Sequence, residues 1–154
     1  MSKHEDANLI LKLYELRRET VMREARIWFF SFNPQSAKDF LDVMISDKSP
    51  YFRMVVSYWD MAASLVNNGA IDEQMFNDAN GEQLFVYSKV EPFLPELRTM
   101  FGMPQYLEHL EKAVKRIPNV DERITGMRER MKQLMALREQ TAVKTQAAAA
   151  ATDV

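Results

Sequence analysis

The spacing of the apolar residues most constrains the fold of this chain. In the longest stretches, apolar side chains recur every three or four residues, as Leu9, Leu13 and Leu16 do near the N-terminus. This spacing places side chains on one face of an α-helix, whereas a half-buried strand needs period-two alternation, which no stretch sustains. Glycine occurs four times and proline six times, mostly where the periodic stretches begin or end. The sequence therefore predicts an all-α protein.

Between these breaks we expect six or seven helices packed as a single helical bundle. The first covers about residues 6–31 and the last about 121–143, so the bundle has long N- and C-terminal helices. Pro92 and Pro95 each remove a helical N–H donor, which predicts a kink or two shorter helices within 82–101. Residues 1–146 form one domain in this prediction, and the alanine-rich residues 147–154 form a frayed or disordered tail.

The composition excludes several classes of site. The chain of 154 residues has no cysteine and two histidines, which excludes a disulfide scaffold, a thiolate metal site and a cysteine nucleophile. No Glu-x-x-His pair of the kind that di-iron bundles use is present. With 20 basic and 22 acidic residues the net charge is −2, so no overall field draws the chain to nucleic acid. We expect neither a metal nor a cofactor.

Motifs for catalysis and for targeting are also missing. No serine lies in a Gly-x-Ser-x-Gly turn and no glycine-rich phosphate loop follows a strand, so we assign no catalytic residues and favour a non-enzymatic protein over an enzyme. The most apolar run, residues 27–32, is far shorter than a membrane span, and we expect it to be a buried helix end. The N-terminus lacks the apolar stretch of a signal peptide, which predicts a cytoplasmic location.

A candidate pocket is centred on Tyr58, Trp59 and Asp60, the most interesting aromatic and acidic cluster of the chain. If Trp59 faces the core, Asp60 lies about 100° round the helix, near the boundary with solvent. Asp60 is then either a hydrogen-bonded boundary acid or part of a small-molecule or enzymatic site between helices. This pocket is one alternative for the function of the protein.

A candidate interface lies on the last helix. Its apolar residues follow 4-3-4-3 spacing, which is typical of a helix that pairs with another helix: Val120, Ile124, Met127, Met131, Leu134 and Met135. The best interpretation is a non-enzymatic helical interaction protein that associates with itself, as a homodimer, or with another helical protein. A nucleic-acid-associated regulator acting through residues 112–132 is the further alternative, although acids interleave with the seven basic residues of that segment.

The middle of the chain resembles a known family. Three marks carry the resemblance within residues 54–116: Tyr58-Trp59-Asp60 on a helix that ends at Gly69-Ala70-Ile71-Asp72, the amphipathic stretch from Phe85 to Leu97-Arg98, and Tyr106-Leu107-Glu108-His109-Leu110-Glu111. Together they are similar to an uncharacterised bacterial all-helical domain family of unknown function. This resemblance implies a helical fold, and it implies no activity, cofactor or catalytic residue.

Overall fold

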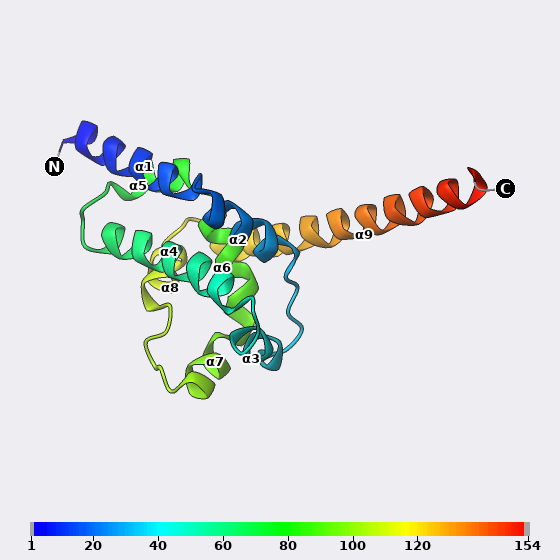
Figure 1. The fold of residues 1–154 in the computed structure, drawn as a ribbon. Coiled ribbons are helices and arrows are strands. Elements are labelled where there is room, and N and C mark those ends of the chain that lie inside the picture. Colours follow the sequence, from blue (N-terminus) through cyan, green and yellow to red (C-terminus); the bar gives the residue numbers. More distant parts are fainter. Residues whose placement is uncertain (1, 153–154) are drawn as a thin grey trace. The chain divides into compact units, whose positions relative to one another are not determined.

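The protein is all-helical in the computed structural model, which describes residues 2–152 (Figure 1). No strand occurs among these residues, so the predicted all-α class is confirmed. The helices are α1 (Lys3–Arg17), α2 (Thr20–Ser31), α3 (Ala37–Met44), α4 (Ser49–Asn67), α5 (Glu73–Ala79), α6 (Glu82–Val90), α7 (Leu94–Phe101), α8 (Glu108–Lys115) and α9 (Val120–Thr152), with a 3₁₀ turn η1 (Glu91–Phe93) before α7. The chain forms two compact units, one ending at Val120 and one beginning at Asp121.

The prediction of six or seven helices with a long N-terminal helix is wrong, because that helix is broken. The structure describes nine α-helices, and α1 and α2 replace the single helix expected over 6–31. The break lies at Glu19, whose backbone is extended and whose side chain accepts the Met22 N–H at 2.8 Å. This carboxylate satisfies a free N–H at the start of α2, and its charge suits the positive end of the helix dipole.

The second break is the one that the prolines predict. Residues 82–101 form α6, the turn η1 and α7, with Pro92 in the turn and Pro95 at the start of α7. A proline is tolerated in the first turn of a helix because the N–H that it lacks has no helical partner there. The expectation of two shorter helices in this stretch is confirmed.

Helix α4 is the centre of the unit that ends at Val120. It packs most extensively against α8 and α2, and also contacts α3 and α6. Figure 1 shows this helix running through the middle of the unit. Eight of its side chains are buried and cover more than one face of the helix: Phe52, Val55, Val56, Tyr58, Trp59, Ala62, Ala63 and Val66. A helix buried over so wide a face is a core helix rather than a surface helix.

Phenylalanine rings join α2, α3 and α4 at one end of this core. Phe32 lies 5.4 Å from Phe40 and 6.3 Å from Phe29, measured between ring centroids, and Phe40 lies 5.8 Å from Phe52. Edge-to-face and tilted pairs at these separations add to the stabilisation from burial. Within the apolar run 27–32, Phe29 is buried, Trp28, Phe30 and Phe32 are half-buried and Ile27 is 67% exposed, so the expectation of a buried helix end holds only in part. No described helix is long and apolar enough to cross a membrane.

The last helix is longer than the sequence predicts. Helix α9 extends over 33 residues to Thr152, beyond the expected end near residue 143. The alanines of 147–151 have the highest intrinsic helix propensity, which suits this extension. Asp153 and Val154 of the predicted tail lie outside the described residues, and both the fraying of 147–154 and the single domain over 1–146 stay predictions.

Candidate functional site

Two of the three predicted pocket residues, Tyr58 and Trp59, are core residues. Their side chains are 8% and 1% exposed, and their rings meet edge to face with centroids 5.0 Å apart. The Tyr58 hydroxyl donates a hydrogen bond of 2.6 Å to the backbone oxygen of Leu13, which fastens α4 to α1. Burial raises the pKa of Tyr58 to about 12, so this hydroxyl stays protonated at neutral pH.

Asp60, the third predicted pocket residue, contacts a different helix from Tyr58. Its carboxylate accepts the N–H of Leu110 at 2.9 Å, in the first turn of α8. This bond caps α8 from another helix, because the first N–H groups of a helix have no partner within it. The structure therefore directs the polar groups of Tyr58 and Asp60 to different helices, α1 and α8. Their known contacts are those of a core helix that holds its neighbours.

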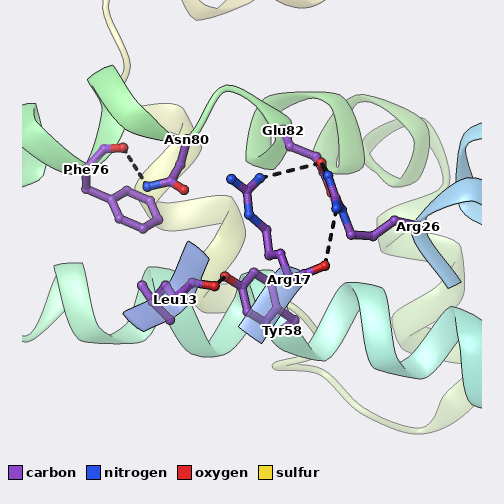
Figure 2. Close-up of polar contacts among 7 residues, drawn as sticks. All are labelled: Leu13, Arg17, Arg26, Tyr58, Phe76, Asn80 and Glu82. Atoms are coloured by element: carbon purple, nitrogen blue, oxygen red, sulfur yellow. Dashed lines mark hydrogen bonds and ion pairs between the residues drawn. The ribbon is translucent and has the colours of Figure 1, made fainter. Parts of the chain in front are cut away.

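An ion cluster that sequence analysis missed lies beside Tyr58 (Figure 2). Arg26 on α2 contacts Glu82 on α6 through two nitrogens, with Nε–Oε1 at 2.9 Å and Nη2–Oε2 at 2.6 Å. Arg17, the last residue of α1, places Nη1 3.6 Å from the same carboxylate. The hydrogen bond and charge of Glu82 raise the pKa of Arg26. Glu82 thus holds together the two helices on either side of the α1–α2 break.

The backbone at the end of α1 and two aromatic rings also contact the ion cluster. Arg26 Nη1 donates to the backbone oxygen of Arg17 at 3.4 Å, where α1 ends (Figure 2). The Arg17 guanidinium lies over the rings of Tyr14 and Trp59, at 5.1 and 5.3 Å from their centroids. A guanidinium stacks well on aromatic faces and is weakly hydrated for a cation, which suits this buried position.

Within residues 2–152, three buried polar atoms have no hydrogen-bond partner: Arg17 Nε, Trp59 Nε1 and Gln83 Oε1. Each such atom costs free energy relative to its hydration in the unfolded chain. The two donors belong to side chains that stack on each other. An arginine stays protonated at any physiological pH, so Arg17 and Arg26 offer hydrogen-bond donors and positive charge but do not transfer protons. The cluster is therefore suited to holding helices together rather than to acid–base chemistry.

Lys89 on α6 caps the end of α2. Its ammonium donates hydrogen bonds to the backbone oxygens of Phe29 at 2.7 Å, Phe30 at 2.9 Å and Phe32. It also lies over the rings of Phe29 and Phe85, at 5.4 and 4.8 Å from their centroids. A cation in this place satisfies the last carbonyls of a helix and complements its dipole. Burial lowers the pKa of Lys89 to about 8.

The six predicted interface residues all lie on α9, and they differ in exposure. Ile124 is 6% exposed, Met127, Met131 and Met135 are half-buried, and Leu134 is 38% exposed. Leu137 extends the apolar surface and is 59% exposed. We call the six residues Val120, Ile124, Met127, Met131, Leu134 and Met135 the α9 stripe.

Lys115 at the end of α8 and Arg116 directly after it face polar groups of their own unit. Arg116 binds Glu73 with Nε–Oε1 at 2.9 Å and Asn67 with Nη2–Oδ1 at 2.8 Å, and Lys115 lies 3.3 Å from Glu111. These contacts give the α8 part of segment 112–132 a role in the fold.

Among residues 2–152, no group of three or more His, Asp or Glu side chains is placed to hold a metal ion.

Comparison with known families identifies the helical unit. The model of a family described as Domain of unknown function (DUF4760) matches residues 3–117, about three quarters of the chain. The chain belongs to this family. The DUF4760 match confirms the resemblance to an uncharacterised domain family and extends it from residues 54–116 to the whole of α1–α8. Helix α9 lies outside it. Comparisons with curated proteins and with solved structures gave no significant match.

The residues of the DUF4760 unit that sequence analysis missed have a common property. Arg26 and Glu82 are 56 residues apart, and Lys89 is 57 to 60 residues from the carbonyls that it caps. No local spacing relates such residues, and a charged residue on an amphipathic helix ordinarily faces solvent. The one local signal is Glu82 in the first turn of a helix, where a carboxylate is favoured in any case.

Replacing Glu82 tests the importance of the ion cluster. We expect Glu82→Ala to lower the free energy of unfolding by about 3 kcal/mol, because it leaves two partly buried arginines without their shared counter-ion. Glu73→Ala is the matched control, since it breaks an ion pair with Arg116 whose side chains are 41% and 36% exposed. The control is expected to cost less than about 1 kcal/mol. Equal losses in urea unfolding would contradict a special role for the cluster.

Lys89 predicts a pH dependence of stability. Between about pH 8 and 10, Lys89 holds its proton in the unfolded chain but releases it in the folded protein, so the free energy of unfolding rises with pH. We expect a rise of up to about 2 kcal/mol, and its loss in Lys89→Met. Lys112→Met, which removes an exposed lysine, is expected to keep the rise. Above pH 10, ionisation of the unfolded chain's tyrosines opposes it, because Tyr58 resists ionisation when folded.

Urea unfolding of the three proteins at about pH 8, 9 and 10 measures this effect. A stability that is flat or falls with pH in the unmodified protein, or a rise that persists in Lys89→Met, would contradict it.

Proposed function

We propose that this protein is a non-enzymatic helical interaction protein and that the α9 stripe is the surface with which it pairs with a helix of another chain. The carrying observation is the form of the unit that begins at Asp121. Its described residues belong to a single helix, α9, and no other element of that unit covers the apolar side chains of the helix.

The energetics of a lone helix support this proposal. An isolated helix is marginally stable in water, and most helical stability in proteins comes from packing an apolar face. Leu134, Leu137 and Val143 are 38%, 59% and 65% exposed. Covering such surface stabilises a complex by about 25 cal/mol for each Å² of apolar area removed from water. The 4-3-4-3 spacing of the α9 stripe is the spacing that a second helix matches.

The residue types of the α9 stripe suit binding. Three of its six members are methionines, Met127, Met131 and Met135, whose flexible and polarisable side chains adapt to different partner surfaces. The DUF4760 match ends at residue 117, before α9 begins. This boundary supports a division in which α1–α8 form a stable base and α9 carries the binding surface.

The core positions of Tyr58 and Trp59 favour this proposal over a small-molecule pocket at Tyr58, Trp59 and Asp60. The Tyr58 hydroxyl and the Asp60 carboxylate each have a backbone partner within the fold. A binding site that uses these groups would have to break the bonds that join α4 to α1 and α8.

Self-association at high concentration tests the proposal. The exposed apolar part of α9, which includes Leu134 and Leu137, is expected to pair with that of a second copy, so the mass from light scattering should rise above 18.0 kDa between about ten and a few hundred micromolar. Met131→Lys places a charge in the stripe and is expected to abolish the rise. Gln133→Lys adds the same charge at an exposed position outside the stripe and is expected to preserve it.

Circular dichroism checks that both variants keep their helical content. A mass that stays at 18.0 kDa over the whole range, or an equal effect of the two lysine variants, would contradict self-association through the α9 stripe.

A further inference from the structure

The α9 stripe is flanked by basic residues. Between residues 120 and 138 the helix carries five basic residues, Arg123, Arg128, Arg130, Lys132 and Arg138, and three acidic ones, Asp121, Glu122 and Glu129. Arg123 and Arg130 each immediately precede a stripe residue, Ile124 and Met131, and both are exposed. In a paired helix these are the positions that face the flank of the other helix.

The acidic residues of this stretch are placed differently. Glu122 and Glu129 are seven residues apart and lie on the side of α9 opposite the stripe, because each is about half a turn from the stripe residues nearest to it. Asp121 is in the first turn, where a carboxylate suits the helix dipole. The surface that a paired helix would meet is therefore more basic than the composition of α9 as a whole.

This charge distribution disfavours a second copy as the preferred occupant. In an antiparallel pair the flanks that carry Arg123 and Arg130 face each other. Like charges at these positions weaken the pair, as they do between neighbouring side chains of one helix. A helix with acidic residues beside its apolar seam gives the same apolar contact with attraction in place of repulsion.

We propose that the natural occupant of the α9 stripe is an amphipathic helix of another protein whose apolar seam is flanked by Glu or Asp. This inference rests on the proposed function and adds the chemistry of the partner. It predicts opposite salt dependences for two processes on one surface. Screening weakens the attraction to an acidic helix and also weakens the repulsion between two copies of α9.

Two synthetic peptides test the inference on the full-length protein. Both are helices of about four heptads with the same Leu and Ile seam, one with Glu and the other with Lys at the seam-flanking positions. The Glu-flanked peptide is expected to bind at least about tenfold more tightly, since several exposed charge pairs change sign between the two. Its affinity should fall between about 0.05 and 0.5 M salt, while self-association of the protein rises.

Two variants separate the charges from the apolar stripe. Met131→Lys is expected to weaken binding of the Glu-flanked peptide, and Gln133→Lys is not. The double variant Arg123→Glu with Arg130→Glu keeps the stripe and is expected to reverse the preference toward the Lys-flanked peptide.

The outcomes distinguish this inference from the function on which it rests. Equal binding of the two peptides, or self-association that weakens with salt, overturns the acidic partner and leaves pairing through the α9 stripe intact. Failure of both peptides to bind, together with a mass that stays at 18.0 kDa, overturns the proposed function itself.

Discussion

Burial of helix α4 is the interaction on which the unit ending at Val120 depends. Helices α2, α3, α6 and α8 all contact it, and its largest side chain, Trp59, is 1% exposed. The residues on either side of Trp59 add hydrogen bonds to neighbouring helices. The Tyr58 hydroxyl donates to a backbone oxygen of α1, and the Asp60 carboxylate accepts a backbone N–H of α8. Three consecutive side chains thus fix the core and two neighbouring helices. This is why the most conspicuous aromatic and acidic cluster of the sequence is structural.

The charged groups of the unit are placed where helices end. The Glu82 carboxylate forms ion pairs with Arg17 and Arg26 beside the α1–α2 break, and Lys89 donates hydrogen bonds to the carbonyls at the end of α2. Charges are costly to bury, and here each has a counter-ion, a set of carbonyls or an aromatic face. Two short helices have more unpaired N–H and C=O groups at their ends than one long helix of the same total length. The cluster and the cap are therefore consequences of dividing the N-terminal stretch into two helices.

Local patterns in the sequence predict much of this fold. The all-α class and the interruption at Pro92 and Pro95 follow from periodicity and from the chemistry of proline. The break at Glu19 does not, because its carboxylate serves equally well within a long helix or as the cap of a new one. For this reason, the predictions of six or seven helices and of a long N-terminal helix are wrong.

The candidate site shows the same limit of sequence analysis. Spacing identifies the α9 stripe as a set, since its members lie on one helix. The contacts of Arg26 with Glu82, and of Tyr58 with Leu13, join residues 56 and 45 positions apart, and they depend on how helices pack. Within one helix, moreover, Tyr58 and Asp60 diverge to different neighbours. Membership of a domain family of unknown function adds no chemistry to these positions.

Helices α1–α8 form a core around α4, and we propose that α9 acts by pairing with another helix. Native-state hydrogen exchange at a protein concentration low enough to keep the chain monomeric tests this most directly. We expect the amides of Val55, Val56, Ala62 and Ala63 to exchange at least about a thousandfold more slowly than unstructured ones. Amides beyond Met131 are expected to be protected only about tenfold or less. Protection of α9 equal to that of α4 in the monomer would show that α9 is stable without a partner helix and would contradict its proposed role in pairing.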